Sequence, residues 1–153
     1  MKISDRDFLS AIWKGVVSRL PYTSTHNYFG NQRGLTPNDK FYMRYATHVC
    51  TAFRSNFIDF PIGNNQSMRR IHKLIERGVL GSDQHRKGSA FHFWLPDNLN
   101  HRAFSRVIEL LTEKGFTEKP RDATGFEDIA KEISATLLAE FGDYPHELME
   151  VGE

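Results

Sequence analysis

A chain of 153 residues, of which 39% are hydrophobic and 12% aromatic, can build a buried core, which excludes wholesale disorder. No apolar run approaches the roughly 20 residues of a membrane span, and the N-terminus has acids and an arginine in its first turns and lacks the cleavage site of a secretory signal. The single cysteine, Cys50, excludes an internal disulfide and a zinc site built on several thiolates. We therefore expect a soluble, cytoplasmic protein without a membrane partner.

The net charge of +1 hides an uneven distribution along the chain. Residues 1–119 contain 18 Lys/Arg and 10 Asp/Glu, a balance of +8, whereas residues 120–153 contain 2 and 9, a balance of −7. A cationic body is attracted to polyanions at moderate salt. We expect a helical domain over 1–119 and an acidic C-terminal helix within 120–153 that serves in packing or dimerisation. The alternative is ordinary fluctuation in composition plus one acidic surface helix.

Two helices are predicted in the first part of the chain. The first covers residues 4–20, where apolar residues recur at helical spacing, and Pro21 ends it. The second covers residues 36–57 and has Thr36 as its N-cap. An alternative division separates the last turns of this second helix, near residues 51–57, as a short helix of their own.

A third helix followed by a hairpin is predicted in the middle of the chain. The helix covers residues 64–77 and ends at Gly78, which stands where a left-handed C-terminal cap is expected. Two strands follow, within residues 79–82 and 89–95, joined by a basic loop.

On a helical wheel, the segment 64–77 separates an apolar face from a polar face. The apolar face can pack on neighbouring helices while the polar face remains open to a partner. The apolar side holds Met68, Ile71, Leu74 and Ile75, and the polar side holds Gln66, Arg69, Lys73 and Arg77, with Arg70 at its flank.

Two further amphipathic helices complete the predicted fold. One covers about residues 100–114 and ends at Gly115, and the other lies within residues 124–143. The predicted fold class is therefore mainly α with a small β-hairpin.

A helix that ends in glycine and runs through Val79 and Leu80 into a hairpin with a basic tip resembles the winged helix-turn-helix superfamily. The resemblance covers about residues 40–96 and indicates no specific family within the superfamily. It implies a winged helix-turn-helix core with extra N- and C-terminal helices. It also implies that the helix enters the DNA major groove while the hairpin, as the wing, contacts the neighbouring backbone or minor groove.

Side-chain chemistry and this resemblance together predict double-stranded DNA as the partner. Glutamine and arginine suit adenine and guanine edges, whereas a helix start and further cations suit phosphates. We expect a transcriptional regulator or an accessory factor in DNA replication or partition, acting as a homodimer and without a cofactor. The predicted DNA-binding residues are Gln66 and Arg69 for bases, Asn64, Asn65, Arg70 and Lys73 for the backbone, and Arg86 and Lys87 for the wing.

The alternative hypothesis is a protein–protein interaction module that uses the same winged-helix scaffold without DNA binding. Its basic patch would meet an acidic surface of the partner protein. An enzyme or a metal site is not expected. The seven histidines show no paired ligand spacing, Cys50 beside Val49 is typical of a core thiol, and no nucleotide-binding glycine motif occurs.

Overall fold

The structure is a computed structural model that describes residues 3–24, 49–50, 58–83, 91–116 and 125–143. In this part of the chain the fold is mainly helical with one small antiparallel sheet, which confirms the predicted class. The elements are α1 (Asp5–Ser24), β1 (Val49–Cys50), α3 (Asn64–Glu76), β2 (Gly81–Ser82), β3 (His92–Trp94), α4 (Asp97–Glu113) and α5 (Phe126–Phe141).

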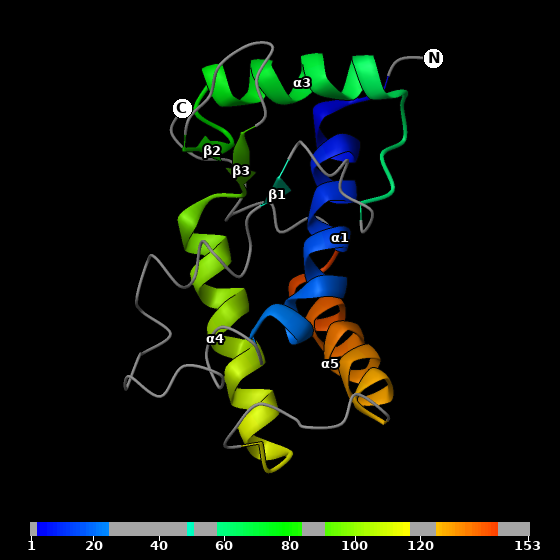
Figure 1. The fold of residues 1–153 in the computed structure, drawn as a ribbon, viewed down its shortest axis with the longest axis vertical. Coiled ribbons are helices and arrows are strands. Elements are labelled where there is room, and N and C mark those ends of the chain that lie inside the picture. Colours follow the sequence, from blue (N-terminus) through cyan, green and yellow to red (C-terminus); the bar gives the residue numbers. More distant parts are fainter. Residues whose placement is uncertain (1–2, 25–48, 51–57, 84–90, 117–124, 144–153) are drawn as a thin grey trace.

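Helices α1, α4 and α5 pack on one another and form a bundle along the long axis of the molecule (Figure 1). Helix α3 lies across one end of this bundle, and the small sheet lies between α3 and α4 (Figure 1). This arrangement places α3 at one extremity of the molecule.

One continuous apolar cluster joins the bundle to α3 and to the sheet. Burying a large apolar side chain stabilises the fold by about 1.5–3 kcal/mol, so this cluster accounts for most of the favourable free energy of folding. Its fully buried large side chains include Phe8, Ile12, Trp13 and Leu20 of α1, Ile71 and Leu74 of α3, Phe93 of β3, and Leu99, Phe104 and Leu111 of α4. The buried face of α5 contributes Phe126, Ala130, Ile133 and Leu137.

Helix α1 extends beyond its predicted end. Pro21 lies inside the helix, which continues to Ser24. The fixed backbone angle of proline is compatible with a helix, although its missing N–H and its ring favour a bend. Figure 1 shows the last turns of α1 bending toward α4.

The predicted helix over residues 36–57 is wrong at Val49 and Cys50. These two residues form β1, which pairs antiparallel with β3 through Val49 opposite Phe93 and Cys50 opposite His92. The pairing with β3 outweighs the local helical pattern, as tertiary contacts often do for short segments. The remainder of this predicted helix lies outside the described residues.

The predicted hairpin is present as β2 and β3, with shorter strands than expected. Gly81 pairs with Trp94, and Ser82 pairs with Phe93. A Cβ added at Gly81 would collide with the indole ring of Trp94, so only glycine fits this position without rearrangement. Since β3 also pairs with β1, the sheet has three strands in the order β1-β3-β2.

Candidate nucleic-acid interface

Helix α3 begins without a capping side chain. Gly63 takes the N-cap position with extended backbone angles, and no side-chain hydrogen bond caps the helix. The first α3 amide that bonds back is that of Ser67, which donates to the Gly63 carbonyl at 2.8 Å. The first turn also contains no acidic residue, so the positive end of the helix dipole is not neutralised there.

The C-terminal end of α3 turns sharply toward the sheet. Gly78 has a φ of 76°, a left-handed conformation that side chains disfavour. The N–H groups of Val79 and Leu80 then donate to the Leu74 carbonyl at 2.9 and 3.2 Å. These bonds fix the direction in which the chain leaves the helix and enters β2.

One face of α3 anchors the helix to the body of the molecule. Ser67, Ile71 and Leu74 are buried, and Met68 and Ile75 pack against the same core. The Ser67 hydroxyl also donates to the Ile62 carbonyl at 3.2 Å. The apolar face predicted from the helical wheel is therefore the face that packs.

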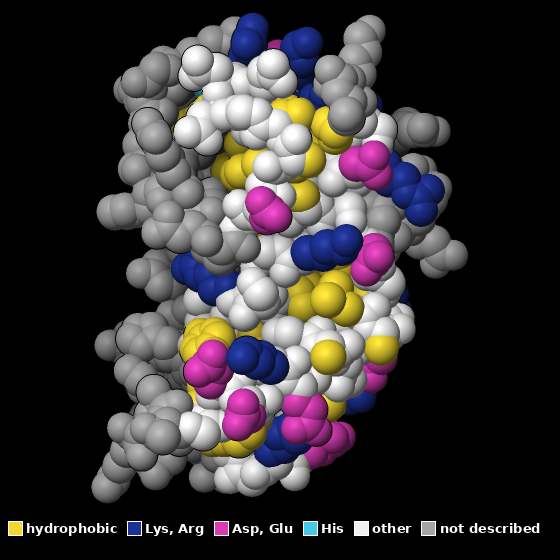
Figure 2. Space-filling model, turned by 90° about the vertical axis from the view of Figure 1, so that its right-hand side faces the viewer, with side chains coloured by type: hydrophobic (Ala, Val, Ile, Leu, Met, Phe, Trp, Pro, Cys, Tyr) yellow, Lys and Arg dark blue, Asp and Glu magenta, His cyan; other side chains and the backbone are white. Residues whose placement is uncertain are grey.

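The opposite face of α3 is exposed, and it carries five of the predicted site residues: Asn64, Asn65, Gln66, Arg69 and Lys73. Figure 2 shows Lys and Arg side chains at the top of the molecule, the end at which α3 lies in Figure 1. Arg69 donates from Nε to the Asn65 carbonyl at 3.4 Å. Among the described residues, neither Arg69 nor Lys73 forms an ion pair with an acid.

Arg70 is placed differently from its neighbours on α3. Its Nη1 lies 3.2 Å from Oδ1 of Asp5 at the start of α1, and the side chain is only 24% exposed. Its guanidinium carbon also lies 5.6 Å from the centre of the Phe8 ring, within the range of a cation–π contact. Arg70 is therefore directed toward α1 and holds α3 on the bundle.

Arg77 shares the same acidic partner. Its Nη1 lies 2.8 Å from Oδ2 of Asp5, while the side chain remains 63% exposed. Sequence reasoning missed Asp5 as a partner of both arginines because 65 and 72 residues separate it from them. An acid in the first turn of α1 is visible in the sequence, but no local pattern indicates which cation it meets.

The two predicted wing residues, Arg86 and Lys87, lie outside the described residues. The base of their hairpin is described, and it is fixed by a pair of contacts between its strands. Oδ2 of Asp83 lies 2.8 Å from Nδ1 of His92, and Oδ1 accepts the His92 backbone N–H at 3.0 Å. The hairpin also contacts α3, since the rings of His72 and Phe91 lie 5.3 Å apart.

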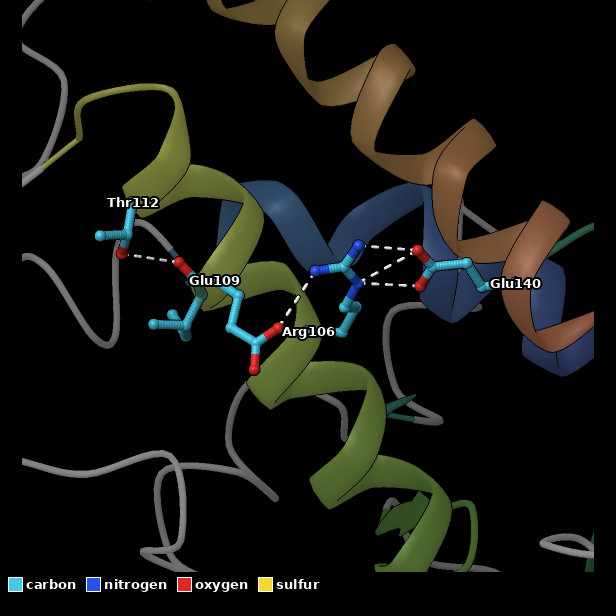
Figure 3. A network of polar contacts seen from close by, with 5 residues as sticks. Arg106, Glu109, Thr112 and Glu140 are labelled. Atoms are coloured by element: carbon cyan, nitrogen blue, oxygen red, sulfur yellow. Dashed lines mark hydrogen bonds and ion pairs between the residues drawn. The ribbon is translucent and has the colours of Figure 1, made fainter.

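Several cations of the bundle differ from Arg69 and Lys73 because they are neutralised by acids. Arg106 of α4 donates to both carboxylate oxygens of Glu140 on α5, at 2.8 Å from Nε and 2.7 Å from Nη2, and to Glu109 at 3.1 Å (Figure 3). Its hydrogen bonds hold the pKa of Glu140 below the ordinary value. Lys114 lies 2.9 Å from Glu132.

Other kinds of site find no support in the described part of the chain. No three His, Cys, Asp or Glu side chains of the described residues come together in a way that could hold a metal ion. None of the described helices is long and apolar enough to cross a membrane. Comparisons with protein-family models, curated proteins and solved structures gave no match for this chain.

Proposed function

We propose that this protein binds double-stranded DNA through the exposed face of α3, within a winged helix-turn-helix core. The observation that carries the proposal is the contrast between the two faces of one helix. One face is fixed in the core, and the other presents Gln66, Arg69 and Lys73 to solvent at an extremity of the molecule. A helix with side chains is about 10–12 Å in diameter and the major groove is about 12 Å wide, so such a helix fits the groove.

The connection between α3 and the sheet supports the winged-helix part of the proposal. The chain passes from α3 through the left-handed Gly78 directly into the β2–β3 hairpin. A hairpin so close to the helix brings a second element to the same nucleic acid. Arg86 and Lys87 stay proposed wing contacts.

The roles of the α3 residues follow from their exposure and chemistry. Gln66 and Arg69 present donors that suit adenine and guanine edges, and Lys73 suits a phosphate. Asn64 and Asn65 lie beside the uncapped helix start, where backbone N–H groups favour an anion. Arg70 contributes mainly by orienting α3, since its guanidinium contacts Asp5 and Phe8. A regulatory or replicative role, homodimer formation and a cytoplasmic location stay predictions.

The proposal is tested by titrating random-sequence duplex DNA with wild type and with Arg69→Ala/Lys73→Ala, at about 50 and 200 mM salt. Charge-assisted contacts contribute on the order of 1.5 kcal/mol or more, so the variant should bind about tenfold or more weakly at the lower salt. The slope of log affinity against log salt should also fall by about 0.9 for the phosphate contact of Lys73, and by about 1.8 at most where Arg69 meets a phosphate of the random sequence as well.

A matched control removes two lysines from the bundle instead. Lys14 and Lys131 are 51% and 72% exposed and lie on α1 and α5. Lys14→Ala/Lys131→Ala removes the same formal charge and should leave the salt slope nearly unchanged. Equal losses in both variants, or no wild-type binding at about 50 mM salt, would contradict the proposal. The alternative, an acidic protein partner for the same face, would then be sought by pull-down.

A further inference from the structure

The carboxylate of Asp5 bridges Arg70 of α3 and Arg77, the residue that caps the C-terminal end of this helix. One oxygen is 3.2 Å from Nη1 of Arg70 and the other is 2.8 Å from Nη1 of Arg77. The carboxylate therefore occupies guanidinium donors at the edge of the surface that we propose for DNA.

The position of Asp5 is fixed by its own helix. It lies in the first turn of α1, where the helix dipole favours a negative charge. The Ser4 hydroxyl accepts the Asp7 N–H at 3.1 Å and so caps this turn. The carboxylate is thus held at the crossing of α1 and α3.

The two arginines differ in how readily they can exchange this partner. Arg70 is 24% exposed and lies over the Phe8 ring, so it is anchored twice. Arg77 is 63% exposed and follows Arg69 and Lys73 at steps of four residues, which places it on adjacent turns of the exposed side. Arg77 is therefore the cation that a phosphate can reach.

We propose that Asp5 is an internal competitor of DNA phosphate for Arg77, an inference that rests on the proposed function. Asp5 contacts Arg77 through Nη1 alone, and its negative charge offsets the guanidinium charge, so a phosphate that approaches the same group competes with the carboxylate for it. Asp5 lowers the affinity of α3 for DNA backbone of any sequence. Asp5 does not contact Gln66 and Arg69, the residues that we propose for base contacts. It therefore weakens binding through phosphates but not binding through bases, which favours recognition of sequence.

The test measures the binding of random-sequence duplex DNA by wild type and Asp5→Asn between about 50 and 200 mM salt. Release of Arg77 should add one phosphate contact and steepen the salt slope by about 0.9, which makes the loss of affinity over this fourfold range about 3.5-fold larger. Affinity at the lower salt should rise. Circular dichroism and thermal unfolding establish whether the variant keeps the helix content and the stability of wild type.

Asp7→Asn is the matched control, since it removes the same charge from the same turn. Asp7 is exposed, and among the described residues its side chain forms no ion pair. Asp7→Asn should leave the slope at its wild-type value. If Asp5→Asn and Asp7→Asn behave alike while wild type binds DNA, the inference is overturned and the proposed function stands. Absence of wild-type binding overturns both.

Arg77→Gln gives a second measurement that does not depend on how Asp5→Asn folds. With Asp5 present, Arg77→Gln should change DNA affinity less than twofold, whereas Arg69→Gln should weaken it several-fold. In the double variant Asp5→Asn/Arg77→Gln, the gain from Asp5→Asn should vanish. Equal losses from Arg77→Gln and Arg69→Gln, or a gain that persists without Arg77, would overturn the inference.

Discussion

Pro21 leaves one carbonyl of α1 without its helical partner, and α5 supplies the missing donor. Within a helix, the N–H of residue 21 would bond to the carbonyl of residue 17, and proline has no N–H. The Ser134 hydroxyl of α5 donates to the Val17 carbonyl at 3.0 Å. Because Val17 is fully buried, water is a poor substitute for this hydroxyl. A side chain 117 residues away thus allows the helix to continue through a proline.

Ser134→Ala should lower the free energy of unfolding by about 1–3 kcal/mol, since it leaves a buried carbonyl unsatisfied. In a Pro21→Ala background, residue 21 again has a backbone N–H that can bond to the Val17 carbonyl. Ser134→Ala should then lower the free energy of unfolding clearly less. Urea unfolding of the four proteins in this cycle measures the difference. Thr136→Ala is the control, since among the described residues this hydroxyl bonds within α5, to the Glu132 carbonyl at 3.0 Å. An equal cost of Ser134→Ala in both backgrounds would show that Pro21 is irrelevant to this bond.

At the scale of single elements, the ion pair between α4 and α5 gives the bundle a pH-dependent contribution. Arg106 holds the pKa of Glu140 below its ordinary value of 4.5. A lowered folded-state pKa means that the stabilisation is fully present above the ordinary value and is lost as pH falls through the lowered one. Figure 3 shows the two helices joined by this contact.

Glu140→Gln should lower the free energy of unfolding at pH 7 by about 1 kcal/mol or less, because the pair is partly exposed and screened by solvent. Well below pH 4.5 the variant and wild type should be equally stable. Urea unfolding at both pH values tests this. Glu127→Gln is the control, since Glu127 pairs with Lys131 at 3.3 Å on one exposed helix surface and should matter less. If Glu140→Gln remained less stable than wild type at low pH, its lower free energy of unfolding would come from altered packing and not from the lost charge.

Some elements are predictable from the sequence and others are not. An element is predictable when the contacts that form it join residues close together along the chain. Helix α3 is predictable because its apolar spacing and Gly78 are local signals, and both its extent and its packed face agree with the structure. Strand β1 is not predictable from the sequence, because Val49 becomes a strand residue by pairing with Phe93, far along the chain. For the same reason the sequence indicates that Arg70 is cationic but not that Asp5 holds it.

At the scale of the whole molecule, the cations of α3 and those of the bundle differ in whether the described residues give them an acidic partner. The exposed side of α3 at one end carries Arg69 and Lys73 without an acidic partner among the described residues. Figure 2 shows acidic side chains in both halves of this face, and over the lower half they lie beside basic ones.

The acidic C-terminal helix is closely tied to the rest of the molecule. The Trp13 indole donates to the Gly142 carbonyl at 3.0 Å, and its ring lies 5.6 Å from that of Phe141. The buried face of α5 packs on α1 and α4 within the same core. These contacts give the apolar face of α5 a partner inside the molecule. Dimerisation stays a prediction.

A chain that ends at residue 119 should therefore fail to unfold cooperatively, although the sequence suggests a separate domain over 1–119. Removing α5 exposes the apolar surfaces of α1 and α4 that it covers and leaves the Trp13 indole without its acceptor. The measurement is urea unfolding followed by circular dichroism and by Trp fluorescence, which should give non-coincident, shallow transitions. The full-length variant Leu137→Ala is the graded control: one truncated core side chain costs about 2–5 kcal/mol but keeps a single steep transition. A single cooperative transition of the shortened chain would instead establish that α1, α3 and α4 fold as an independent unit, with α5 as an addition to it.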